Sequence, residues 1–159
     1  MILTCIRTLL ISMAMAVVGV TAVAVATPAF ADQPATYTGR FSNVAVGGYD
    51  PVAYFTAGRP VRGSDAFKII HRGAEYRFAS AENLAAFRAN PDRYAPQYGG
   101  YCAWAISQGY TAPGNPNNWR IVDGKLYLNY NAEIQRRWEG DIPTFIRNAN
   151  ANWPSVLRR

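Results

Sequence analysis

Two side chains in this sequence stand out for the chemistry that they can do. His71 is the single histidine among the 159 residues, and Cys102 is one of two cysteines. The other, Cys5, lies in an N-terminal segment that we expect to be removed. A thiolate and an imidazole can together bind a soft metal, or can act as nucleophile and base. Cys102 and His71 are therefore the candidate metal ligands, and copper or another soft metal ion is the cofactor that they suit.

Cys102 has two further interpretations. Apolar residues follow it directly in residues 103–106, which favours a small side chain buried in the core. It also lies near the start of a predicted helix, where backbone N–H groups lower the pKa of a thiol. A reactive thiol there, with His71 as its base, would make the protein a thiol-dependent redox protein or enzyme. The sequence alone leaves these alternatives open.

Aromatic residues are the second chemical feature. They make up 13% of the chain, and several surround Cys102 in the sequence. They are typical of a pocket for a flat or apolar ligand, or of an aromatic core in a domain without a disulfide. The candidate pocket residues are Tyr98, Tyr101, Trp104 and Trp119.

The N-terminal segment resembles an export signal. Arg7 precedes an apolar stretch over residues 9–25, and residues 29–31 read Ala-Phe-Ala. This order is typical of a signal peptide cleaved after Ala31, although the apolar stretch is also nearly long enough for a membrane anchor. We expect cleavage, a periplasmic or secreted protein, and no membrane span in the mature chain.

Charge and motifs exclude several functions. The formal net charge is +6, but the basic residues are scattered, whereas nucleic-acid binders gather them into a patch. We therefore expect no nucleic-acid partner. The sequence also contains no glycine-rich phosphate loop, no GxSxG and no HExxH motif. We assign no catalytic constellation, and the oligomeric state is not predicted.

Short strands and helices must position these residues. Residues 66–71 and 75–78 alternate as two strands, and Ser80 is a good N-cap for a helix that ends near residue 89. Residues 110–118 read as a loop. Asp123-Gly124 lies between apolar runs in 119–130 and predicts a hairpin. Asn131 and Asp141 can cap two more helices. No internal repeat is evident, and the pattern predicts one small α+β domain.

Three segments resemble a known family. GYDPVAYF (48–55), YRFASAEN (76–83) and NPDRY (90–94), together with Phe87, are similar to the YHS domain. Segments within 99–154 resemble the C-terminal extension of exported bacterial YHS proteins. The resemblance implies metal binding through thiols, but the corresponding residues here are Ala53, Ala79 and Asn83, which supply none.

The predicted organisation is a signal peptide (1–31), an N-terminal arm (32–46), a YHS-like unit (47–98) and a C-terminal extension (99–159) packed in the same domain. The predicted function is an exported YHS-type binding module for a metal ion or small ligand. Thiol chemistry at Cys102, or a structural or interaction role in the cell envelope, are the alternatives.

Overall fold

A computed structural model of the chain describes residues 32–158. Short helices alternate with two antiparallel strand pairs, so the predicted α+β class is confirmed. The predicted signal segment, with its cleavage site after Ala31, lies outside the described residues. Within residues 32–158 no helix has the length and the apolar character needed to cross a membrane.

The first half of the described chain forms a unit that we call unit 1, residues 45–94. Its strands coincide closely with the predicted ones, and its main helix begins after the predicted cap, because the Ser80 side chain accepts a hydrogen bond from the Asn83 N–H. The elements are η1 (Ala45–Gly48), α1 (Ala53–Thr56), β1 (Ser64–His71), β2 (Ala74–Phe78), α2 (Ala81–Ala89) and α3 (Pro91–Tyr94).

The second half forms unit 2, residues 97–152. The predicted hairpin is confirmed, with Asp123 and Gly124 both at positive φ as the turn requires. The predicted loop ends earlier than expected, because the first strand already begins at Asn115. The elements are η2 (Gln97–Gly100), α4 (Ala103–Ser107), β3 (Asn115–Val122), β4 (Lys125–Asn129), α5 (Ala132–Glu139) and α6 (Ile142–Asn152), followed by η3 (Ser155–Arg158).

The two units have the same architecture in the same order, so the expectation of no internal repeat is wrong for the fold. In unit 1 the hairpin pairs Ser64 with Phe78, and a bulge follows before Lys68. In unit 2 it pairs Asn115 with Asn129, 51 residues later in both strands (64 to 115, 78 to 129), with the same bulge before Trp119.

Equivalent turns and caps produce this likeness. Tyr49 and Tyr101 each follow two glycines at positive φ, a conformation that glycine adopts without steric cost. The helices after each hairpin are also capped alike. Asn131 caps α5 as Ser80 caps α2, and Asp141 caps α6 as Asn90 caps α3, each side chain accepting a hydrogen bond from an N–H three residues later.

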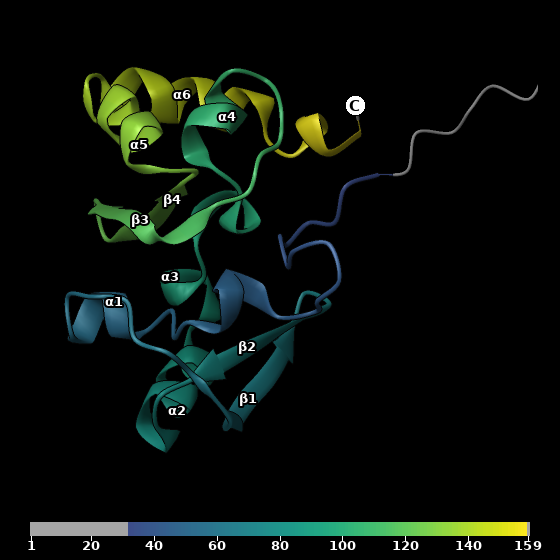
Figure 1. Cartoon of the computed structure of the whole chain (residues 1–159), viewed down its shortest axis with the longest axis vertical. Helices are drawn as coiled ribbons and strands as arrows, with labels where there is room; N and C mark the ends of the chain where they lie inside the picture. The colour runs from purple at the N-terminus through teal and green to yellow at the C-terminus, as the bar shows by residue number, and fades with distance from the viewer. Residues whose placement is uncertain (1–31, 159) are drawn as a thin grey trace, which may run out of the picture.

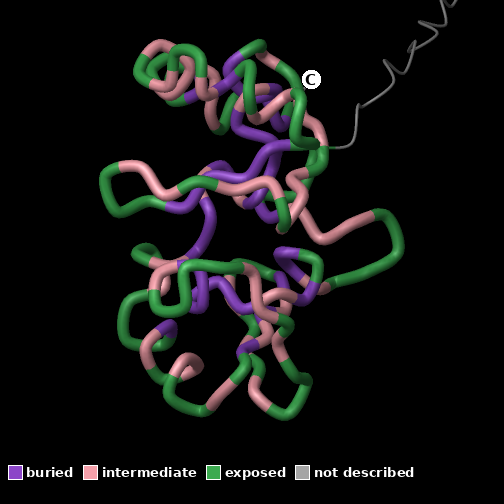
Figure 2. Tube along the Cα trace, turned by 60° about the vertical axis from the view of Figure 1, so that its left-hand side comes forward, coloured by how far each residue is buried: buried purple, intermediate pink, exposed green. Residues whose placement is uncertain are grey.

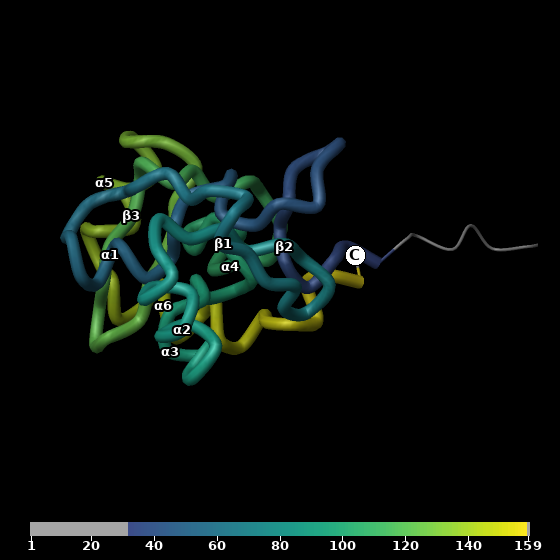
Figure 3. The backbone as a smooth tube through the Cα atoms, turned by 90° about the horizontal axis from the view of Figure 1, so that it is seen from below, coloured from purple at the N-terminus to yellow at the C-terminus, as the bar shows by residue number. Residues whose placement is uncertain are grey.

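The units are stacked along the vertical axis of Figure 1, with the β3–β4 hairpin between the helices of unit 2 and the whole of unit 1. Viewed from below, they overlap (Figure 3). Buried segments run through both units and across their junction (Figure 2). Leu126 and Leu128 of β4 belong to the same apolar cluster as Tyr54 and Phe78 of unit 1. A second cluster, around Trp138 and Tyr127, fills unit 2.

Candidate functional site

Cys102 is fully buried at the N-terminus of α4. Its thiol lies 3.7 Å from the side-chain oxygen of Asn129, which also accepts the Trp104 N–H at 3.2 Å. Because that oxygen is an acceptor, the thiol must donate its proton to it. Burial raises the pKa of Cys102, although the backbone groups of Ala105, Tyr130 and Trp104 act in the opposite direction. The thiol is therefore held in its protonated form.

His71 ends strand β1 in unit 1. Its ring contacts the rings of Tyr76 and Phe87 edge-on, with centroid distances of 5.9 and 5.6 Å. Burial and the neighbouring Arg72 lower its pKa, whereas Asp92 raises it. No hydrogen bond or ring contact of the described residues joins His71 to Cys102, and the two belong to different units. The predicted metal pair stays a prediction.

The positions of the family's thiols do come together in space, around the buried carboxylate of Asp50. One oxygen of Asp50 accepts the N–H groups of Val52 at 2.8 Å and Ala53 at 3.3 Å. The other accepts the Ala79 N–H at 2.8 Å and the Asn83 amide at 2.7 Å. Four donors saturate this carboxylate, and alanine offers no ligand. These residues do not fit a soft metal ion.

Residues 32–158 contain no cluster of three or more His, Cys, Asp or Glu side chains placed to hold a metal.

The four aromatic residues predicted to form a pocket lie in different places. Tyr98 lines a cleft of about 520 Å³, and Trp104 lines a smaller cavity beside Cys102. The Tyr101 hydroxyl donates to the carbonyl of Pro34 at 2.9 Å. Trp119 packs edge-on against Tyr54 of unit 1, with ring centroids 5.1 Å apart. Of these four, Tyr98 is the one that lines the 520 Å³ cavity.

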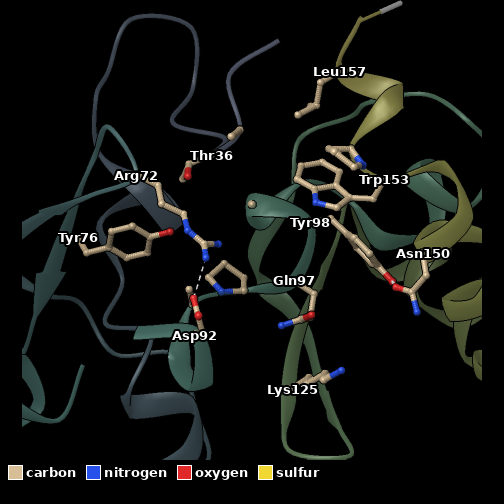
Figure 4. Close-up of a pocket in the computed structure, with 15 residues that line it drawn as sticks. Thr36, Arg72, Tyr76, Asp92, Gln97, Tyr98, Lys125, Asn150, Trp153 and Leu157 are labelled. Atoms are coloured by element: carbon tan, nitrogen blue, oxygen red, sulfur yellow. Dashed lines mark hydrogen bonds and ion pairs between the residues drawn. The ribbon is translucent and has the colours of Figure 1, made fainter. Parts of the chain in front are cut away.

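That cavity is a cleft of about 520 Å³ to which both units and the N-terminal segment contribute, and we call it the interunit cleft. Figure 4 shows its two walls facing each other, polar side chains of unit 1 on the left and aromatic side chains of the C-terminal half on the right. The lining includes Thr36, Arg72, Tyr76, Asp92, Gln97, Tyr98, Lys125, Asn150, Trp153 and Leu157.

The polar wall is built at the tip of the first hairpin. Arg72 occupies the turn at positive φ, and its guanidinium forms an ion pair with Asp92 at 2.8 Å. Both side chains are more than half exposed, so the pair contributes little to stability. Behind them, burial raises the pKa of the Tyr76 hydroxyl, whereas the neighbouring Thr36 side chain and Arg72 act in the opposite direction. Lys125 stands at the edge of the cleft and makes no ion pair with any described residue.

The aromatic wall is held rigidly. Tyr98 is buried, and its hydroxyl donates to the side-chain oxygen of Asn150 at 2.9 Å. Burial raises the pKa of Tyr98 far above its usual range. The indole of Trp153 packs edge-on against Tyr98 at a centroid distance of 5.9 Å. An aromatic wall held by these contacts, opposite an exposed arginine, is an arrangement that can hold a flat molecule and a charged group together.

Sequence reasoning found Tyr98 but missed the rest of this cleft. Arg72, Asp92 and Trp153 are far apart in sequence, and each has an ordinary turn, cap or core explanation by itself. A usable signal was the similarity between Gly47-Gly48-Tyr49 and Gly99-Gly100-Tyr101. It indicates a repeated unit, and two stacked units create a junction where ligands commonly bind.

The fold and the site thus define a small α+β protein of two similar units with a cleft between them. Residues 52–98 match the YHS domain, so this chain is a YHS domain-containing protein. The match covers most of unit 1 and ends at Tyr98, so the aromatic wall lies almost entirely beyond it. Neither a curated protein nor a solved structure was found to match the chain.

Proposed function

We propose that this protein is an exported binding module that holds a small organic anion with a flat apolar body in the interunit cleft. The observation that carries the proposal is the cleft itself. Its volume of about 520 Å³ falls within the range of about 300–1,000 Å³ that is common for small-molecule sites. Aromatic and polar groups converge on it from segments far apart in the chain.

Charge supports an anionic group on the ligand. Arg72 and Lys125 line the cleft together with a single acidic residue, Asp92. The guanidinium of Arg72 can exchange its exposed partner for a ligand carboxylate, because a planar guanidinium binds carboxylates in a bidentate manner. The opposite wall of Tyr98 and Trp153 then contacts the flat part of the ligand.

Binding is favoured over catalysis by the state of the candidate nucleophile. Cys102 is buried outside the cleft, and its proton is held by Asn129. His71, the base that it would need, lies in the other unit against Tyr76 and Phe87.

Export is part of the proposal and rests on the sequence of residues 1–31. Mass spectrometry of protein recovered outside the cytoplasm should find Asp32 at its N-terminus, and retention of Met1 would contradict export.

Benzoate is a suitable probe, because it combines one ring with one carboxylate. We expect saturable shifts of the Trp153 indole resonance in NMR titrations with benzoate, and weaker ones with the neutral benzyl alcohol. Arg72→Ala should weaken benzoate binding by about fivefold, the effect of losing one exposed charge pair. Asp92→Asn should strengthen it, because Arg72 is then free.

Arg59→Ala is the matched control, because Arg59 is also an exposed arginine but does not line the cleft. It should leave benzoate binding unchanged. Equal losses in the Arg59 and Arg72 variants would reduce the effect to net charge. The absence of any saturable shift at Trp153 with benzoate would refute an anion site in the cleft.

A further inference from the structure

The repeat gives unit 2 four positions equivalent to those of the Asp50 network in unit 1. The residues equivalent to Asp50, Ala53, Ala79 and Asn83 are Cys102, Ala105, Tyr130 and Ile134. The backbone hydrogen bonds support this equivalence. The Asp50 N–H donates to the Val61 carbonyl at 2.8 Å, and the Cys102 N–H donates at 2.9 Å to the carbonyl of Ala112, which lies 51 residues after Val61. All four of these unit 2 residues line one cavity of about 190 Å³, together with Trp104, Tyr110 and Ala112.

The different side chains explain why the space is filled in one unit and open in the other. In unit 1 the Asp50 carboxylate and the Asn83 amide bond to each other at 2.7 Å across it. In unit 2 a short thiol and an isoleucine replace them, and neither can make that bond. Tyr130, in place of Ala79, is 51% exposed, so much of its side chain lies at the surface and not in the space.

The rim of this cavity is unusually apolar for a surface. Large hydrophobic side chains that are exposed within residues 32–158 are Phe41, Ile70, Tyr110 and Tyr130, and the last two both line the cavity. Exposed apolar groups gathered around a hollow mark an interaction site more often than scattered ones do. The lining contains no charged side chain, so an ion entering it would lose its hydration without gaining a partner.

We propose that this cavity is a second binding site, specific for an uncharged aromatic molecule of one or two rings. Its volume of about 190 Å³ exceeds the roughly 150 Å³ at which an apolar cavity in a protein already binds benzene. Trp104 and Tyr110 lie edge-to-face with centroids 6.3 Å apart and offer ring edges and faces to the ligand. The protonated thiol of Cys102 forms part of the wall, as a polarisable contact for an aromatic ring.

Indole is the probe that we would use, with the protein from Asp32 to its C-terminus. In NMR titrations the amide resonances of Ala105, Tyr130 and Ile134 should shift saturably, and those around Trp153 should not. Tyr110→Ala removes an exposed rim side chain without affecting the core, and should weaken indole binding by at least about threefold. Phe41→Ala, which removes an exposed ring elsewhere, should leave the affinity unchanged.

A second variant fills the cavity. Ala112→Leu should abolish the indole shifts, whereas Ala132→Leu, on the exposed start of α5 and outside the lining, should not. Should Ala112→Leu fail to fold, the Tyr110 and Phe41 variants still decide the question. Indole shifts that are absent, confined to the interunit cleft or unchanged in both Tyr110→Ala and Ala112→Leu would overturn the proposal. The benzoate experiment is independent, because it reports on Trp153 and Arg72.

Discussion

Units 1 and 2 have the same backbone frame and carry aromatic rings at equivalent buried positions, but the outer faces of their hairpins differ in polarity. Tyr76 and Phe87 of unit 1 correspond to Tyr127 and Trp138 of unit 2, and all four are buried. On the other face of the hairpin, Glu75 and Arg77 of unit 1 correspond to Leu126 and Leu128 of unit 2. The frame thus depends on the inner face, and the outer face reflects what covers it.

The covering partner explains this difference. The outer face of β4 lies against unit 1, where Leu126 and Leu128 join its core. The outer face of β2 is not covered by the other unit and stays partly exposed, and Glu75 forms ion pairs there with Arg77 at 2.7 Å and with Lys68 at 3.4 Å. Charged outer faces at the end of a stack of repeats keep further copies from adding. Unit 1 is in this sense the capping unit.

Exchanging the outer faces should give the largest effect. Leu128→Arg installs the residue that unit 1 has at this position, but it buries a charge inside the junction of the two units. We expect a loss of at least about 4 kcal/mol in the free energy of unfolding, from lost burial and from an unpaired buried charge. Urea denaturation measures this, with Leu128→Ala at about 3 kcal/mol as the milder variant if the first fails to fold.

The reverse exchange is the control. Arg77→Leu installs the unit 2 residue on a partly exposed face, and should change the stability by less than about 1 kcal/mol. Similar losses for Leu128→Arg and Arg77→Leu would show that the two faces are equally covered, and that the description of unit 1 as the capping unit is mistaken.

The next largest effect concerns the Asp50 network. Asp50→Ala removes a fully buried carboxylate and leaves its four donors without their acceptor. Unsatisfied buried groups cost about 1–3 kcal/mol each before relaxation, so a total loss of about 3 kcal/mol is expected in urea denaturation. Asp65→Ala, on the exposed part of β1, should be nearly neutral. A loss below about 1 kcal/mol for Asp50→Ala would mean that water replaces the carboxylate.

Local signals in the sequence predicted much of this fold. Asp123-Gly124, Ser80, Asn131 and Asp141 act within a few residues of themselves, and the hairpin and helix starts follow from them. The repeat is not evident in the sequence because the equivalent residues of the two units agree mainly in glycines and buried rings. The spacing also shifts by one residue within each unit, from 52 between Tyr49 and Tyr101 to 51 in the hairpins. A constant period is therefore not visible along the chain.

A smaller effect is expected when the chemistry of Asp50 is transferred to unit 2. Cys102→Asp places a carboxylate beside the side-chain oxygen of Asn129, which already accepts the Trp104 N–H. Turning that amide to favour the carboxylate would leave the Trp104 N–H without its acceptor. We expect a loss of about 2 kcal/mol in the free energy of unfolding.

Ile134→Asn supplies the amide that Asn83 supplies in unit 1. The double variant Cys102→Asp with Ile134→Asn should therefore be more stable than the sum of the two single variants predicts, by at least about 1 kcal/mol. The same unfolding measurements give this coupling. Strict additivity would imply that the two networks are not equivalent in space, whatever their positions in the chain.

The sites were harder to predict than the fold, for a physical reason. Cys102 and His71 were chosen because each residue type is rare, but rarity does not bring two residues together. Arg72 and Trp153, which line opposite walls of the interunit cleft, face each other because the two units stack. The 80 residues between them (73–152) contain no local pattern that predicts this placement. A site whose side chains lie on both sides of a junction can be predicted only once the junction itself is known.

The smallest expected effect is a dependence of stability on pH that belongs to unit 1 alone. Burial and Arg72 lower the pKa of His71 below its ordinary value of 6.5, so the unfolded chain takes up this proton first as the pH falls. The contribution of His71 to the stability is then fully present above about pH 6.5, and it decreases below that pH until His71 is protonated in the folded protein as well.

Val122 replaces His71 in unit 2, and His71→Val should abolish the decrease in stability between pH 7 and pH 5.5. The lowered pKa of Glu75 acts at more acidic pH, below its ordinary value of 4.5, and so does not interfere. Thermal unfolding across this range measures the slope, and an identical slope in wild type and His71→Val would show that the histidine ring is not buried against Tyr76 and Phe87 in solution.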